Sequence, residues 1–271
     1  ARGLGSVRVV RVATWNVNSL KARLGRLEEW LAEVGPDVVC LQETKLADAA
    51  FPAMAFAALG YESAHHGEGR WNGVAILSRV GLEDVRPGFC NGRVVGPEGA
   101  EDAEARLLSA RCGGVRVASL YVPNGRAVGS EHFRFKLDWL AQLRRHLDES
   151  CDPGGDVLLC GDFNIAPEDR DVWDVAEVAN GTHVTPPERA ALAELTSWGL
   201  VDVLRARHQE PRLYTWWDYR AGMFHKHMGM RIDLMLASKP LADRLEWVLV
   251  DRNARKGKAP SDHAPMVAEF A

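Results

Sequence analysis

The sequence lacks long hydrophobic runs, has few cysteines and carries little net charge, and each absence excludes a class of protein. No apolar segment approaches the roughly 20 residues that span a bilayer, and the first residues lack the apolar block of a secretory signal. We therefore expect a cytoplasmic protein without a membrane partner. The five cysteines include no CxxC pair, so we expect neither a disulfide framework nor a zinc site. A formal net charge of −4 argues against a protein whose whole surface coats nucleic acid.

The composition is that of an ordered globular protein. Hydrophobic residues make up 46% and charged residues 26% of the 271 residues, which suffices for a large core. This length suits two average domains or one large one. No linker, internal repeat or low-complexity tract interrupts the chain, so we predict a single domain over residues 1–271.

Apolar runs and helical periodicity predict a mixed α/β fold. Amphipathic helices are expected over 19–34 and over 130–149, the second with Ser130 as its cap. Residues 167–210 have a less regular pattern. Because strands and helices alternate without a strict βαβ rhythm, we predict two packed β-sheets flanked by helices. The expected strands are 7–14, 38–41, 73–77, 106–112, 115–125, 157–160, 231–238 and the closing segment 261–270.

Several of these strands end in polar residues suited to chemistry. They are Asn16, Glu43, Tyr121 with Asn124, and Asp162 with Asn164. The ends of central strands line the main cleft of layered folds, so we expect these side chains to converge. Local alternatives remain open. Asp162 or Asn164 can cap a turn, Asn16 and Asn18 can form one, and Glu43 can pair with Lys45 or an arginine in place of a cation.

A carboxylate and a histidine near the C-terminus predict a second polar pair. Asp233 lies within the apolar run RIDLMLAS and needs a hydrogen-bonding partner, for which His263 is the natural candidate. The alternative is that Asp262 caps a turn and His263 lies nearby without a role. We interpret four other histidines as loop residues, because no third ligand is spaced to complete a zinc site: His65, His66, His225 and His227.

Six motifs occur in order along almost the whole chain: TWNVNSL, LQETK, YVPNG, GDFNIAP, YTWWDYRAGMF continuing to GMRIDLMLAS, and SDHAP. Together they closely resemble the exonuclease III family of apurinic/apyrimidinic endonucleases, bacterial type, within the endonuclease/exonuclease/phosphatase fold. The resemblance implies a four-layer α/β sandwich and a Mg²⁺-dependent DNA-repair enzyme, with Mn²⁺ able to substitute. It also implies cleavage 5′ of abasic sites, 3′–5′ exonuclease activity and cleaning of 3′ ends on double-stranded DNA. We expect a monomer.

The resemblance assigns roles to residues at matching positions. Asp162 would activate the attacking water that Asn164 places, and Tyr121 and the His263–Asp233 pair would stabilise the phosphate. The implied metal ligands are Glu43, Asn16 and Asp262. The implied DNA-binding residues are Asn124, Arg126, Trp216, Met230 and Ile232, the last three forming a pocket for a base-less sugar.

Two alternative functions follow from the same residues. One keeps the fold and changes the substrate, as in a nuclease resembling deoxyribonuclease I, a phosphatase or a sphingomyelinase. Basic stretches at 122–129, 219–231 and 251–263 favour DNA, although each alone is typical of a solvated loop. The other alternative is a DNA-binding protein that has lost catalysis. Its expected mark is the loss of Glu43, Asp162 or His263, and all three are present.

Overall fold

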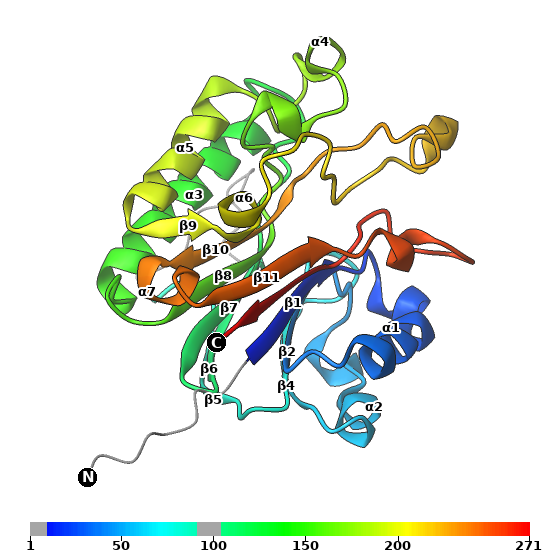
Figure 1. The fold of residues 1–271 in the computed structure, drawn as a ribbon, viewed down its shortest axis with the longest axis vertical. Helices are drawn as coiled ribbons and strands as arrows, with labels where there is room; N and C mark the ends of the chain where they lie inside the picture. The colour runs from blue at the N-terminus through cyan, green and yellow to red at the C-terminus, as the bar shows by residue number, and fades with distance from the viewer. Residues whose placement is uncertain (1–9, 91–103) are drawn as a thin grey trace.

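Two six-stranded β-sheets pack face to face, with helices covering the outer face of each (Figure 1). This computed structural model describes residues 10–90 and 104–271. Among these residues, no helix is both long and apolar enough to cross a membrane. The observed layers confirm the predicted four-layer α/β sandwich.

The first sheet contains the first and last strands of the described chain. β1 lies at its centre, parallel to β2 and antiparallel to β12, so β1 and β2 point toward the same edge. α1 (Leu20–Val34) and α2 (Ala53–Ala58) cover its outer face. The strands in spatial order are β11 (Leu245–Val250), β12 (Met266–Phe270), β1 (Val10–Asn16), β2 (Val38–Gln42), β4 (Val74–Ser78) and β3 (Glu62–His66).

The second sheet has a parallel pair, β7 and β8, at its centre, and β10 lies antiparallel to β8. α3 (Glu131–Ser150) and α5 (Pro186–Ser197) cover its outer face (Figure 1). The strands in spatial order are β5 (Glu83–Pro87), β6 (Leu107–Cys112), β7 (Val115–Tyr121), β8 (Val157–Asp162), β10 (Asp233–Ser238) and β9 (Leu200–Asp202). Short segments complete the chain: η1 (Asp48–Ala50), η3 (Asp169–Asp171), α4 (Val175–Val178), α6 (Val203–Arg207), η4 (Arg220–Gly222), α7 (Lys239–Ala242) and η5 (Arg252–Arg255).

The helices form where the apolar pattern predicted them. In α1 the residues Leu20, Leu27 and Leu31 are fully buried, and the helix ends at Gly35, whose φ of 60° suits glycine. In α3 the Ser130 side chain accepts a hydrogen bond from the Phe133 amide, which confirms Ser130 as the cap. Apolar residues from the inner faces of both sheets form one core cluster that joins the two layers.

Some predicted boundaries were wrong. The first strand runs to Asn16, and its expected start at 7–9 lies outside the described residues. β7 ends at Tyr121 instead of Gly125, because the following Pro123 and Gly125 leave the sheet. Two histidines interpreted as loop residues, His65 and His66, lie in β3. That strand, like β5, is an edge strand with few apolar residues, so it lacks the apolar alternation that marks a strand.

Candidate active site

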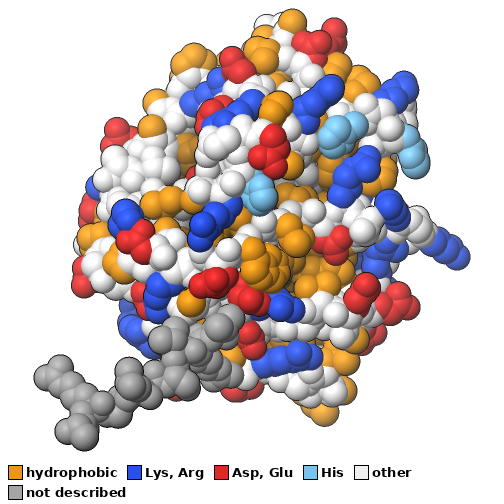
Figure 2. Space-filling model, in the orientation of Figure 1, with side chains coloured by type: hydrophobic (Ala, Val, Ile, Leu, Met, Phe, Trp, Pro, Cys, Tyr) orange, Lys and Arg blue, Asp and Glu red, His pale blue; other side chains and the backbone are white. Residues whose placement is uncertain are grey.

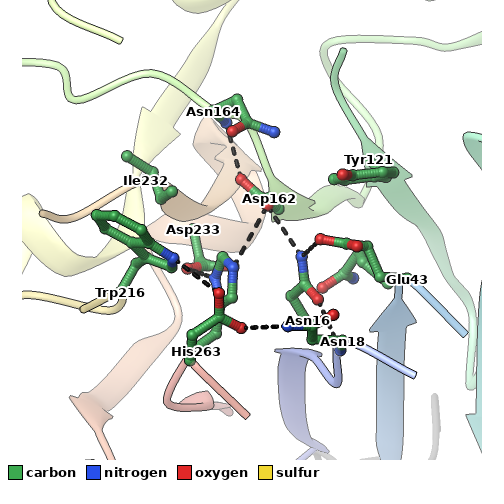
Figure 3. Close-up of polar contacts among 12 residues, drawn as sticks. Asn16, Asn18, Glu43, Tyr121, Asp162, Asn164, Trp216, Ile232, Asp233 and His263 are labelled. Atoms are coloured by element: carbon green, nitrogen blue, oxygen red, sulfur yellow. Dashed lines mark hydrogen bonds and ion pairs between the residues drawn. The ribbon is translucent and has the colours of Figure 1, made fainter. Parts of the chain in front are cut away.

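The predicted site residues converge at one end of the sandwich (Figure 3). Asn16 ends β1, Glu43 follows β2, and Asp162 ends β8. Asp233 begins β10 and pairs directly with Asp162 across the sheet, and His263 precedes β12. Both sheets therefore contribute side chains to the same small volume.

Asn16 connects the two sheets. Its Nδ2 donates to Glu43 Oε1 at 2.9 Å and to Asp162 Oδ2 at 3.0 Å. Its Oδ1 accepts from the Asn18 backbone amide at 3.0 Å, so the turn predicted from local chemistry is also present. Glu43 has a φ of 50° and lies 2.9 Å from Lys45 Nζ. The salt bridge with Lys45 thus exists within the site, and the two interpretations of Glu43 do not exclude each other.

Asp162 is a buried acid with a perturbed pKa. Its side chain is 2% exposed, and its Oδ1 accepts from the Asn164 amide at 2.9 Å. Burial raises the pKa of Asp162 to about 7, and the nearby Asp233 carboxylate adds to this effect. A carboxyl group with a pKa near neutrality is suited to taking a proton from water.

His263 and Asp233 form the predicted pair. His263 Nδ1 donates to Asp233 Oδ2 at 2.8 Å, and its Nε2 lies 3.8 Å from Asp162 Oδ2. Burial lowers the pKa of His263, but the nearby carboxylates of Asp233, Asp262 and Asp162 together outweigh burial and raise it to about 10. A positively charged imidazolium therefore faces the site at neutral pH.

Three side chains place possible ligand atoms close together. Atoms of Glu43, Asp162 and His263 lie within 4.8 Å of one another. The two carboxylates offer the hard oxygen ligands that Mg²⁺ and Mn²⁺ prefer. Asp262 is directed elsewhere: its Oδ1 accepts from Asn18 Nδ2 at 2.9 Å and its Oδ2 from Trp216 Nε1 at 3.1 Å.

Tyr121 and Asn124 lie beside this centre. The Arg106 guanidinium lies 4.8 Å from the centre of the Tyr121 ring. Burial and the neighbouring Glu43 keep the pKa of Tyr121 well above its usual value, so its hydroxyl remains a proton donor. Asn124 Nδ2 donates to Asn164 Oδ1 at 3.1 Å. A cavity of about 480 Å³ extends from Tyr121 and Asn124 to Arg126 and the exposed Trp71.

The three residues predicted to hold a base-less sugar lie together. Trp216 and Met230 pair through their backbones, and both pack with Ile232 in one apolar cluster. Met230 and Ile232 are 8% and 2% exposed, so they present little surface to a ligand.

Two residues near the site, the buried Lys136 and the half-buried His183, were missed from the sequence. Lys136 lies on α3 and donates to the backbone carbonyl of Asn164 at 2.6 Å. The pKa of His183 is lowered to about 3 by burial and by the positive charges of Lys136 and His263, so its ring is neutral. His183 lies in an irregular stretch, and no sequence feature indicates a functional role for it. Lys136 could have been found, because it stands among the apolar residues of an amphipathic helix.

The basic loops protrude at this end of the sandwich. Figure 2 shows Lys, Arg and His side chains along the right of the view, where 217–232 and 251–262 extend in Figure 1. Lys256 and Lys258 are exposed. Arg255 is not, because it is 5% exposed, donates to the Trp217 carbonyl and packs on Tyr219. Arg255 therefore does not belong to the exposed basic surface of the stretch 251–263.

Comparison with known proteins agrees with this geometry. Residues 13–263 match the model of the Endonuclease/Exonuclease/phosphatase family. The exodeoxyribonuclease III of Haemophilus influenzae is 34% identical, over 96% of this chain and all of that protein. An AP endonuclease from Archaeoglobus fulgidus superimposes with a TM-score of 0.90 at 37% identity, over 96% of this chain and 99% of the other. A 3′ phosphatase from Neisseria, solved with a product DNA hairpin, gives 0.89 at 39% identity, over 97% and 99%. The chain therefore belongs to the endonuclease/exonuclease/phosphatase family and, within it, is similar throughout its length to exodeoxyribonuclease III.

Proposed function

We propose that this chain is a Mg²⁺-dependent DNA-repair phosphodiesterase. It cleaves 5′ of abasic sites in double-stranded DNA and removes nucleotides and blocking groups from 3′ ends. The observation that carries the proposal is the juxtaposition of Asp162, with its raised pKa, and the His263 imidazolium, 3.8 Å apart and adjacent to Glu43. A base and a cation at this spacing suit the attack of water on a phosphodiester.

The residues perform hydrolysis in one displacement. Asp162 takes a proton from a water molecule that Asn164 holds, and the water oxygen attacks phosphorus. The bond from phosphorus to the 3′ oxygen breaks, and the departing oxygen takes a proton from solvent, leaving a 3′ hydroxyl and a 5′ phosphate, while Asp162 returns its proton to solvent. His263 and the Tyr121 hydroxyl donate to the phosphate oxygens and stabilise the charge that develops there. Asp233 fixes the orientation and the charge of the His263 ring.

Glu43 is the residue that we assign to metal binding, and Asn16 holds its carboxylate in place. Glu43 would hold a Mg²⁺ ion, and that ion would supply charge stabilisation to the transition state. Glu43 retains a partly exposed carboxylate among buried neighbours, which suits a cation that keeps several of its waters. Asp262 is secondary, since its oxygens lie against Asn18 and Trp216 and it is not among the three residues whose ligand atoms lie within 4.8 Å of one another.

The remaining contacts are assigned to the DNA. Asn124 and Arg126 contact the backbone near the scissile phosphate, and the exposed lysines of 251–263 contact phosphates farther away. Trp216, Met230 and Ile232 receive the base-less sugar. The enzyme acts as a monomer in the bacterial cytoplasm, on the DNA of the nucleoid.

A second candidate function is favoured by the burial of Met230 and Ile232. If the apolar cluster does not open, an extruded sugar has no room, and the enzyme acts at 3′ ends without cutting internal abasic sites. The chemistry at phosphorus is the same in both cases.

One assay tests both candidates. Purified protein is incubated with a duplex containing one abasic analogue, a duplex with a recessed 3′ hydroxyl, and a duplex with a 3′ phosphate, each with Mg²⁺ and with EDTA. We expect Mg²⁺-dependent cleavage of all three. Cleavage confined to the 3′ ends supports the second candidate. No cleavage of any substrate, with normal DNA binding, would show a catalytically silent protein.

A further inference from the structure

Lys136 lies completely inside the protein, and its charge is directed at the loops of the active site. Both Lys136 and Glu188 have side chains that are 0% exposed, and they form an ion pair between α3 and α5. Lys136 Nζ also donates to the backbone carbonyl of Asn164 at 2.6 Å and to that of Asn124 at 3.4 Å. The three protons of the ammonium thus have three acceptors. A buried charge is costly unless it is paired in this way.

The two carbonyls belong to loops that need support. Asn164 has a φ of 51°, and Asn124 precedes Gly125 and Arg126, whose φ values are 87° and 52°. The left-handed conformation is unfavourable for residues other than glycine and persists only where surrounding contacts hold it. A Cβ on Gly125 would lie 3.2 Å from Lys136 Cδ, so the lysine stem packs directly against this loop.

Glu188 fixes the other end of the ion pair. Its Oε2 accepts from the His183 amide at 2.9 Å, the Thr185 amide at 3.1 Å and Thr185 Oγ1 at 2.6 Å. These bonds cap α5 and leave Oε1 for Lys136. The ammonium therefore has a fixed position relative to α3 and α5. Its hydrogen bonds to the two carbonyls hold both loops relative to these helices.

We propose that Lys136 is a positioning residue for phosphodiester cleavage, which rests on the proposed function. By holding the carbonyls of Asn124 and Asn164, it keeps their side-chain amides, which are hydrogen-bonded to each other, in place beside Asp162. It also maintains the Asn164 amide that donates to Asp162. Lys136 itself touches no substrate.

The test removes the charges as a pair, because removing one alone leaves the other buried and unpaired. In Lys136→Met/Glu188→Gln the glutamine oxygen still accepts from His183 and Thr185. We expect the rate of single-turnover cleavage at saturating enzyme to fall at least about tenfold. The stoichiometry of DNA binding should stay at one site per chain, which shows that the variant is folded. The matched control is Arg11→Met/Glu269→Gln, which removes a partly buried pair away from the site and should stay within about twofold of wild type.

A double-mutant cycle distinguishes positioning from general destabilisation. Asn124→Ala and Asn164→Ala are each added to the wild type and to the paired variant. If Lys136 acts through these residues, each alanine costs less in the paired variant, because its side chain is already misplaced. Full losses in both backgrounds, or a paired variant within about threefold of wild type, would overturn the proposal.

A second variant covers the possibility that the paired variant does not fold. Lys136→Arg keeps a buried positive charge opposite Glu188, but its planar guanidinium cannot reproduce the three donor directions of the ammonium, and we expect its cleavage rate to fall clearly below that of wild type. A rate equal to wild type refutes the positioning role. A wild-type protein that cleaves no DNA would instead refute the proposed function.

Discussion

At the residue scale, the charge of Asp162 should matter more than its shape. Asp162→Asn keeps the size and most hydrogen bonds of the side chain but removes the base, which is worth a factor of about 10² to 10⁴ in rate. DNA binding should persist or tighten, because a negative charge near a phosphate is lost. Single-turnover cleavage measured beside equilibrium binding checks this. A loss below about tenfold with normal binding would assign proton removal to another group.

The pH dependence of the cleavage rate should follow from the pKa values of the buried Asp162 and His263. Asp162 acts as a base only when ionised, and burial raises its pKa to about 7, so activity is lost as the pH falls through that region. His263 keeps its charge up to a pKa of about 10, so the rate declines only at alkaline pH. Bound Mg²⁺ should shift the acid limb lower by favouring the carboxylate. Rates measured at low and high Mg²⁺ check the shift, and an acid limb retained in Asp162→Asn would contradict the assignment.

Glu43 should govern the metal requirement. Glu43→Ala removes a cation ligand but leaves the DNA-binding loops intact, so raised Mg²⁺ should recover part of the lost rate. Lys45→Met is the matched control, because it breaks the salt bridge and keeps the carboxylate. Mg²⁺ titrations of both variants distinguish the two roles of Glu43. Equal defects without recovery by Mg²⁺ would identify Glu43 as a structural acid.

At the element scale, the loop that carries Lys256 and Lys258 should determine much of the salt dependence. Replacing both lysines with Gln removes two phosphate contacts and should lower the slope of log Kd against log salt by about 2. Arg255 stays unchanged because it is buried and supports Trp217. DNA binding is measured at several salt concentrations. An unchanged slope would place this loop away from the DNA.

The elements also show where sequence reasoning succeeded. Central strands such as β2 and β8 are buried on both faces and read as apolar runs, so they were predicted together with the polar residues that follow them. Edge strands such as β5 are exposed along their length and have no such pattern. The pairing of Asp233 with His263 was predicted because a carboxylate in an apolar run needs a partner.

At the scale of the whole molecule, the parts that were not predicted depend on tertiary packing. Arg255 belongs to a basic stretch by sequence, yet it is buried because the loop folds back on Trp217 and Tyr219. Lys136 and Glu188 are far apart in the sequence, and nothing local indicates that α3 and α5 bring them together. The hydrogen bond from Lys45 to the Asn18 side chain likewise requires the folded loop.

The position of β1 between β2 and β12 has a consequence for protein synthesis. β1 leaves the ribosome first among the described strands, but one of its neighbours and His263 emerge near the end of the described chain. During translation β1 therefore has one unpaired edge, and the growing polypeptide lacks His263, to which we assign stabilisation of the phosphate. If that assignment is right, a nuclease built in this order cannot cut DNA before the segment that carries His263 has been synthesised.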